Sequence, residues 1–237
     1  MKNLVSTILI LTAFGTITNV YSQSADEIVQ KYLEALGGIE KLQEIKSFKL
    51  TGTMTSMGID MPVTIVAAEP NKIYTEISFT GQSIISAFNG EYKWDQNPLM
   101  QSTLPIKATV EESEAASKEM YENVFIDYKK KGHTISYEGI GNISFSDFFK
   151  VRMTTNEGDE TFYYFDQESY LLHATETTTE DGIVATNIFS EYDLLENGSY
   201  KHFTTEILVN GEISMGIYAS EIEINPELDD SFFDMPE

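Results

Sequence analysis

Apolar residues just beyond residue 22 recur with the spacing of one helix face: Ile28, Tyr32, Leu33 and Leu36. The preceding residues, Ser24 to Glu27, form a capping-box pattern, in which a serine caps the helix and a glutamate reaches back to it. Gly37 and Gly38 tolerate the left-handed backbone with which helices commonly end. The pattern therefore predicts one helix up to this glycine pair and a second short helical piece over Ile39–Ile45.

From Ser47 onward the apolar period changes to two, which is the period of a half-buried strand. About a dozen strand patterns then follow, separated by turns that contain Gly, Asn, Asp or Pro. They cover residues 47–55, 59–67, 73–79, 83–88, 91–95, 133–138, 147–155, 161–165, 170–179, 183–192, 200–209 and 212–224. This succession indicates an antiparallel meander rather than an alternating βαβ fold. No Ser- or Pro-rich linker divides the chain, so we expect a single domain.

The segment between the fifth and sixth predicted strands differs from the rest. Asn97–Ala108 contains Pro98 and Pro105, and we predict a loop with apolar residues. Thr109–Asn123 is predicted to be a helix, with acidic residues in its first turns, where they interact favourably with the helix dipole. The apolar side of this helix is sparse and consists of Val110, Ala116, Met120 and Tyr121.

The strand patterns place many apolar side chains on one face of the sheet. These are Phe48, Leu50, Met54, Met61, Val63, Ile65, Ile77, Phe79, Met153, Phe162 and Tyr164. A sandwich would cover such a face with a second sheet, whereas a curved sheet would leave a concavity for helices or a ligand. Methionine and aromatic side chains suit a flexible apolar ligand, since they repack without polar demands. A plain packed core accounts for the same residues equally well, so the pattern leaves both interpretations open.

The charge balance limits the partners that this chain can bind. It has 38 acidic and 15 basic residues, which gives a formal charge of −23. Nucleic acids and anionic membrane surfaces are bound through basic patches, so we expect neither as a charge-driven partner. Arg152 is the only arginine and cysteine is absent, so the sequence offers no arginine clusters, disulfides or thiolate sites. With 14 Phe and 13 Tyr residues, the chain is not of the disordered class.

No residue pattern points to catalysis or to metal binding. His133, His173 and His202 lie on separate predicted strands without the paired spacing of metal ligands, and we interpret them as ordinary strand residues. No G-x-S-x-G motif is present, and no carboxylate pair stands out from the acidic background. The acidic loop Asn156–Glu160 has oxygen ligands for calcium but not the spacing of an EF-hand, and we interpret it as a solvated turn. We therefore predict no catalytic residue, no metal and no cofactor.

The first residues have the pattern of a secretory signal peptide. Lys2 precedes an apolar run from Leu4 to Phe14, and small or neutral residues lead to Ser22. The run is shorter than the ~20 apolar residues of a stable membrane span. We predict a signal peptide over residues 1–22 and an exported, periplasmic domain over 23–237, which has 237 − 22 = 215 residues. A buried N-terminal helix or an uncleaved anchor is the alternative.

Several short segments occur in an order that is typical of one protein family. They are residues 28–38 with 46–48, residues 69–74 with their Pro-Asn pair, residues 88–95 with Asn-Gly and Trp94 followed by Pro98, residues 164–166, and residues 232–236. In these segments the chain resembles the LolA-like outer-membrane lipoprotein-sorting proteins, which are periplasmic lipoprotein carriers. One position departs from the family. The carriers tend to have a basic residue just before the Pro-Asn pair, near the cavity mouth, where this chain has Glu69.

The resemblance implies a mainly β fold of the α+β class. A single antiparallel curved sheet of about eleven strands would form an incomplete barrel, lidded by a few helices. The apolar cavity would hold the acyl chains of a lipid or lipoprotein and exchange them with membrane-bound donor and acceptor proteins, as a step of outer-membrane biogenesis. The helix around Met120 is the expected lid, and Trp94 is expected near the cavity rim. The residues expected to line the cavity are Leu50, Met54, Met61, Val63, Ile65, Ile77, Phe79, Trp94, Leu104, Met120, Phe162 and Tyr164.

Two other functions are compatible with this sequence. An all-β periplasmic hydrolase, an esterase or a glycosidase, would need a Ser/His/Asp set or paired carboxylates gathered in a pocket. An interaction module would instead have a filled core and no ligand. A continuous apolar cavity beside the sheet favours the carrier over both.

The N-terminal pattern generates a prediction about processing. Export of the full chain should yield a product that begins near Gln23, because the apolar run ends in small residues that suit cleavage after Ser22. Intact-mass measurement of the exported protein checks this. Residues 1–22 retained on a membrane-bound product would contradict it.

Overall fold

The computed structural model describes residues 23–100, 102–117, 123–179, 181–229 and 231–236. The predicted signal peptide, as well as Met120 and Tyr121 of the predicted lid helix, lies outside the described residues. No helix in the described ranges is both long and apolar enough to cross a membrane.

The first two helices are α1 (Ala25–Ala35) and α2 (Ile39–Glu44). The predicted cap is confirmed, because Oγ of Ser24 accepts a hydrogen bond from the backbone N–H of Glu27 at 3.2 Å. The predicted end at the glycine pair is also confirmed. Gly37 and Gly38 have φ of +109° and +94°, and the N–H of Gly38 donates to the carbonyl of Leu33 at 2.9 Å.

The third helix, α3 (Val110–Ser117), begins within the segment where the mid-chain helix was predicted. A reciprocal capping box fixes its start. The N–H of Glu112 donates to Oγ1 of Thr109 at 3.2 Å, and the N–H of Thr109 donates to the carboxylate of Glu112 at 2.8 Å. Residues 118–122 of the predicted helix lie outside the described residues.

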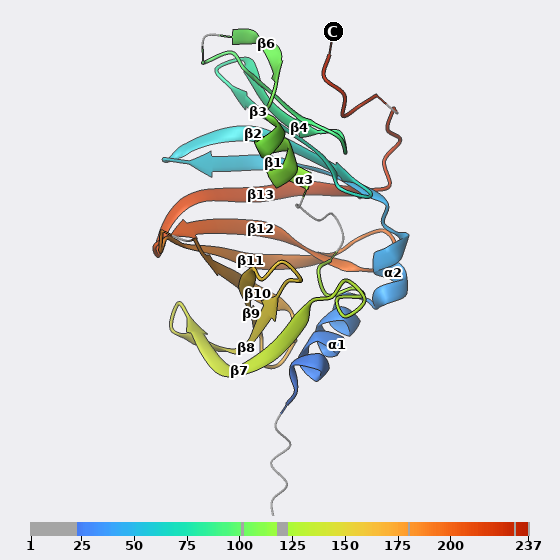
Figure 1. Cartoon of the computed structure of the whole chain (residues 1–237), viewed down its shortest axis with the longest axis vertical. Coiled ribbons are helices and arrows are strands. Elements are labelled where there is room, and N and C mark those ends of the chain that lie inside the picture. Colours follow the sequence, from blue (N-terminus) through green and yellow to red (C-terminus); the bar gives the residue numbers. More distant parts are fainter. Residues whose placement is uncertain (1–22, 101, 118–122, 180, 230, 237) are drawn as a thin grey trace, which may run out of the picture.

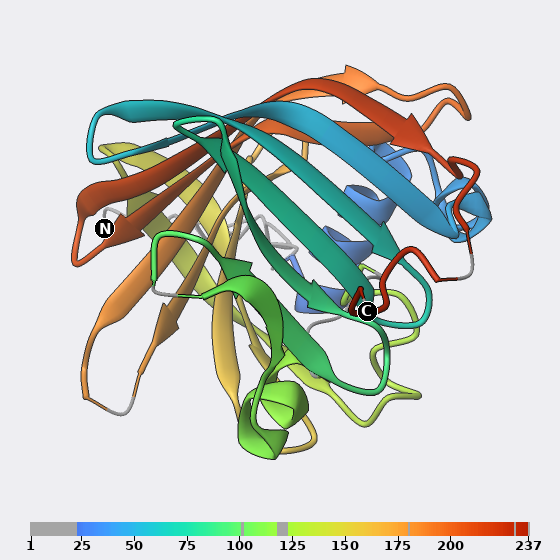
Figure 2. The ribbon, with the colours of Figure 1, turned by 90° about the horizontal axis from the view of Figure 1, so that it is seen from above.

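All strands belong to one antiparallel sheet with the order β6-β5-β4-β3-β2-β1-β13-β12-β11-β10-β9-β8-β7. The strands are β1 (Ser47–Ser56), β2 (Ile59–Ala68), β3 (Lys72–Phe79), β4 (Gln82–Phe88), β5 (Lys93–Asn97), β6 (Ser102–Lys107), β7 (Thr134–Ile143), β8 (Ser146–Thr154), β9 (Glu160–Phe165), β10 (Leu172–Thr178), β11 (Val184–Leu194), β12 (Tyr200–Val209) and β13 (Glu212–Ile224). The chain thus forms two meanders, which meet where β1 pairs with β13. The sheet curves without closing, since β6 and β7 are its two edges (Figures 1 and 2). This is the predicted curved antiparallel sheet.

One strand was missed by the sequence analysis. Asn97–Ala108 was predicted to be a loop because of its two prolines, yet β6 lies within it and pairs with β5. Both prolines are compatible with this arrangement. Pro98 lies in the turn that the N–H of Met100 closes onto the carbonyl of Asn97 at 3.0 Å. Pro105 lies on an edge strand, where a missing N–H donor is tolerated. The sheet therefore has thirteen strands in the described ranges rather than about eleven.

Helix α1 packs against the sheet and forms the main core. Its stripe is buried, as predicted: Ile28 is 0% exposed, and Tyr32, Leu33 and Leu36 are also buried. They contact side chains of β8, β9 and β10, and Tyr32 lies 5.2 Å from Phe165 between ring centroids. Full burial of such a side chain stabilises the fold by roughly 1.5–3 kcal/mol. Apolar burial along this stripe therefore holds α1 on one meander.

The C-terminal segment covers the other side of the sheet. The ring of Phe232 lies 5.0 Å from that of Tyr74, and Nδ2 of Asn89 donates to Asp234 at 2.8 Å. Trp94 is 2% exposed beneath this segment, and its Nε1–H donates to the carbonyl of Phe233 at 2.9 Å. The indole is therefore a core residue of the β3–β5 region.

This packing predicts the behaviour of a Phe233→Ala variant. Phe233 is 4% exposed, so the truncation should destabilise the fold by about 3 kcal/mol. Trp94 emission should shift to longer wavelength, because water would reach the indole. Urea unfolding and emission spectra measure both effects. Phe145→Ala is the matched control, since Phe145 is fully exposed and its removal should change neither. An unchanged emission maximum in Phe233→Ala would contradict the docking of this segment.

Candidate functional site

Strand pairing determines which side chains share a face of the sheet. Leu50 lies opposite Ile65, Met54 opposite Met61, and Val63 opposite Ile77. Phe79 is two residues beyond Ile77 and therefore has the same orientation. Seven of the twelve predicted cavity residues are thus brought together on one face of β1, β2 and β3: Leu50, Met54, Met61, Val63, Ile65, Ile77 and Phe79.

The same face continues around the sheet to helix α1. A row of paired residues runs from β1 to β8 through Ser56, Met215, Ile207, Asn187, Thr175, Tyr163 and Val151. Ser56 shares its face with Met54, two residues before it. Tyr163 and Val151 at the other end of the row pack against α1. We call this the inner face, since the sheet curves around the side on which α1 lies (Figure 2).

The inner face is covered to different degrees in its two halves. Val151 and Phe165, beneath α1, are 0% exposed. Of the seven predicted residues on β1–β3, Met54 and Val63 are buried, whereas Leu50, Met61, Ile65, Ile77 and Phe79 are half-buried. Ile207, Met215 and Ile217 continue this half-buried apolar surface on β12 and β13. The inner face of β1–β3 with β12 and β13 is therefore apolar and partly accessible among the described residues.

Three predicted cavity residues lie on the opposite, outer face. Trp94 is paired with Ala87, which is paired with Tyr74, and this row ends under the C-terminal segment. The predicted position of Trp94 at the cavity rim is therefore wrong. Its neighbours on β5 alternate between the faces, and the sequence pattern did not show which set would be covered by a distant segment.

Phe162 and Tyr164 were also assigned to the wrong face. They pair with Arg152 and Lys150, whose side chains are polar, and the ammonium of Lys150 lies over both rings, 3.9 Å and 5.1 Å from their centroids. Strand β9 carries aromatic residues on both faces. Tyr163 and Phe165 take the inner positions against α1, so Phe162 and Tyr164 must point outward.

The two remaining predicted residues do not join the seven. Leu104 lies on the edge strand β6 and is 72% exposed. Met120 lies outside the described residues.

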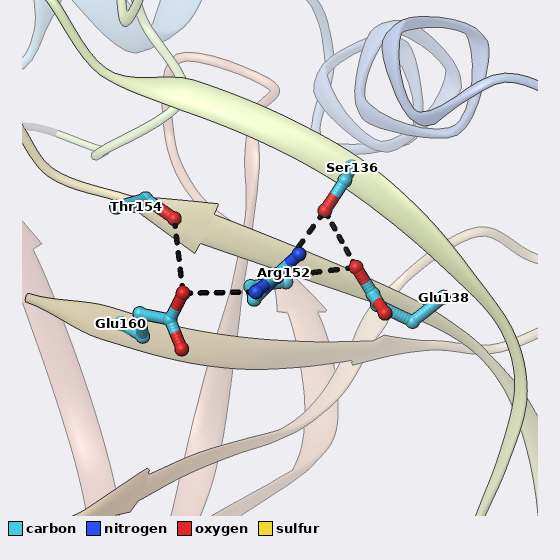
Figure 3. A network of polar contacts seen from close by, with 5 residues as sticks. All are labelled: Ser136, Glu138, Arg152, Thr154 and Glu160. Atoms are coloured by element: carbon cyan, nitrogen blue, oxygen red, sulfur yellow. Dashed lines mark hydrogen bonds and ion pairs between the residues drawn. The ribbon is translucent and has the colours of Figure 1, made fainter.

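The outer face around β7–β9 carries an ion-pair network beside a small apolar cluster of Phe148, Tyr164 and Ala174. Arg152, the only arginine, forms ion pairs with Glu138 at 3.1 Å and with Glu160 at 2.9 Å, and Ser136 joins the network (Figure 3). The hydrogen bond from Ser136 and the charge of Arg152 lower the pKa of the Glu138 carboxyl. The guanidinium is thus engaged by two carboxylates of its own sheet.

A second apolar space, which the sequence analysis did not predict, lies beneath the α1–α2 hairpin. The cavity has a volume of about 190 Å³ and opens between the helices and the ends of β1, β11, β12 and β13. Its lining includes the apolar residues Leu36, Leu42, Ile45, Phe48 and Ile224 and the polar residues Gln43 and Asn123. Phe48 is the first inner-face residue of β1, two positions before Leu50, so the cavity lies at the end of the apolar inner face.

Two titratable groups from β12 also line this cavity. Burial lowers the pKa of the His202 imidazole to about 3, and burial likewise lowers the pKa of the Lys201 ammonium. Nζ of Lys201 lies 4.6 Å from the centroid of the Phe48 ring. Glu69, which departs from the family pattern, borders the cavity as well, but its carboxylate pairs with Lys46 at 2.9 Å.

The three histidines lie in different surroundings. Nδ1 of His133 accepts from the N–H of Asn156, His173 stacks on Phe148, and His202 contacts Phe189 and Tyr192. Within the described ranges, no group of three or more His, Asp or Glu residues has an arrangement that would hold a metal ion.

Comparison with known proteins gives matches at the level of structure. No protein-family model and no curated protein matches the chain. Among solved structures, a DUF1329 family protein from Desulfovibrio piger superposes with a TM-score of 0.58 at 10% identity, over 88% of this chain and 96% of the other. An outer membrane lipoprotein-sorting protein domain from Vibrio parahaemolyticus gives 0.54 at 12% identity, over 87% and 97%. A LolA superfamily protein from Nitrosomonas europaea gives 0.53 at 12% identity, over 85% and 96%. The chain therefore has the fold of a LolA-like half-barrel.

Proposed function

We propose that this protein is an exported, non-enzymatic carrier that binds the acyl chains of a lipid or lipoprotein on the inner face of its half-barrel. The observation that carries the proposal is the apolar inner surface of β1–β3. Five of its side chains are half-buried, whereas Val151 and Phe165, which lie beneath α1 on the same face, are fully buried. Water is then in contact with apolar side chains that face into the curve of the sheet, and an acyl chain would displace that water.

The energetics of acyl binding suit a carrier. Burial of acyl chain is worth roughly 0.8 kcal/mol per CH₂, so a single long chain provides a large gross driving force. Release of such a chain into water would be slow for the same reason. Useful delivery therefore requires transfer to another apolar site, and we propose membrane-bound donor and acceptor proteins for this step.

The solved structures that share the fold support this proposal, since one of them is an outer membrane lipoprotein-sorting protein domain. The N-terminal sequence pattern supports export, and we propose the periplasm as the compartment. The formal net charge of −23 would reduce adhesion of the carrier to anionic membranes between transfers. Glu69 differs from the basic residue of the carriers, so we propose acyl chains, rather than a specific lipoprotein, as the recognised feature.

A pair of neighbouring substitutions tests the inner face. Ile65→Glu would place a carboxylate among the apolar inner side chains, where an acyl chain cannot solvate it. Binding of palmitate should weaken by at least about tenfold, because burying an unpaired charge costs more than the 1.4 kcal/mol that one tenfold step represents. Displacement of an environment-sensitive fluorescent fatty acid measures the affinity. Trp94 is not a suitable reporter, since it is buried on the outer face.

Thr64→Glu is the matched control for this test. Thr64 is adjacent in sequence, is also half-buried, and lies on the outer face. Its substitution should leave palmitate binding within about twofold, and circular dichroism should show both variants folded. Equal binding by wild type and both variants, or no binding and no co-purified lipid in native mass spectrometry of the wild type, would remove the basis for the carrier.

A further inference from the structure

The cavity beneath the α1–α2 hairpin combines apolar walls with one inward-facing cation. Leu36, Leu42 and Ile45 come from the helical hairpin, and Phe48 and Ile224 from the sheet. Lys201 reaches this space from β12, and its ammonium lies above the ring of Phe48. Apolar walls alone would suit the end of an acyl chain. The side chain of Lys201 is half-buried among them and requires a different explanation, because withdrawing a charge from water costs free energy unless it is paired.

The charges around Lys201 do not neutralise it. Burial alone accounts for the lowered pKa of its ammonium, and no neighbouring carboxylate raises that pKa again. Glu69 borders the same cavity but is held by Lys46 at 2.9 Å. Lys41, the lysine of α2, donates instead to the carbonyl of Gly198 at 3.0 Å. In a chain with 38 acidic residues, this cation thus faces a largely apolar cavity without an acidic partner among the residues that the structure describes.

The position of the cavity relates it to the acyl surface. Phe48 forms its wall and is also the first of the inner-face residues that continue through Leu50 to Met54 along β1. A ligand with its head at Lys201 could therefore extend its chain along the inner face of β1 and β2. The volume of about 190 Å³ suits a small head group with the first part of a chain rather than a whole lipid.

We propose that Lys201 is the counter-ion for the anionic head group, a carboxylate or a phosphate monoester, of a single-chain lipid whose chain lies on the inner face. This proposal rests on the proposed function, and it adds the charge and the position of the head group. The ammonium would donate charge-assisted hydrogen bonds to the anionic oxygens, which offset part of the cost of withdrawing it from water. A neutral lipid of equal chain length would leave the ammonium unpaired and should therefore bind more weakly.

The test compares ligands that share a chain and differ in the head. Palmitate and hexadecyl phosphate should bind wild-type protein at least about tenfold more tightly than hexadecanol, as expected for a charged hydrogen bond in a buried site. Acetate and inorganic phosphate, which lack the chain, should not compete. Tighter binding of palmitate than of hexadecyl phosphate would identify a carboxylate as the head group, and the reverse order a phosphate.

Substitutions at Lys201 separate charge from packing. Lys201→Met keeps an unbranched side chain without the charge, so palmitate affinity should fall about 10- to 100-fold while hexadecanol affinity is unchanged or higher. Lys201→Arg keeps the charge and should retain palmitate binding within a few-fold. Lys49→Met, on the outer face of β1, is the matched control and should leave all affinities unchanged.

The outcomes also separate this proposal from the carrier function. If Lys201→Met loses affinity for palmitate and for hexadecanol equally, or for neither, the role of Lys201 is overturned while acyl binding stands. If wild-type protein binds none of the long-chain ligands, the carrier function is overturned instead. Misfolding of Lys201→Met would itself contradict the proposal, because replacing an unpaired, half-buried cation by an apolar side chain should leave the melting temperature unchanged or raise it.

Discussion

The antiparallel pairing of β1 with β13 is the contact on which the rest of the structure depends. It joins the two meanders into one sheet and fixes which side chains of both point inward. A slip of one residue would move the apolar side chains of β1 to the outer face. The pairing contains a register shift between Thr51 and Gly52, and a Cβ at residue 52 would lie 2.1 Å from the carbonyl oxygen of Tyr218. Glycine at this position, which has no Cβ, therefore allows β1 and β13 to lie close together at the register shift.

Because both meanders share an inner face, a single helix can divide that face into a sealed core and a partly exposed apolar surface. Helix α1 seals the meander that contains β8–β10, with Ile28, Val151 and Phe165 each 0% exposed. Tyr128 donates to Asp26 at 2.5 Å and fixes the start of the helix to the segment before β7. On β1–β3, Leu50, Met61, Ile65, Ile77 and Phe79 are left half-buried. The sealed core and the proposed acyl-binding surface thus lie on the same face but at different strands.

The electrostatics follow the same division. The outer face carries paired charges such as the Arg152 network, where solvent screens them (Figure 3). Lys201 is instead surrounded by the helical hairpin and the strand ends, and burial lowers its pKa. The proposed head-group site thus combines this cation with apolar walls, whereas the proposed acyl surface is uncharged.

The amino-acid sequence by itself determined the elements and the class of the fold. Local signals were sufficient for the cap at Ser24, the end of α1 at Gly37 and Gly38, and the alternation along β1 and β2. The sequence also identified seven side chains of the inner face, since adjacent hairpin strands fix one another's orientation. Tertiary structure alone decided the rest. Trp94 is buried by Phe233, 139 residues away, and Phe162 points outward because α1 occupies the other face of β9. Lys201 meets Phe48 across 153 residues of sequence, 201 − 48, and no local pattern encodes a contact between segments that only folding brings together.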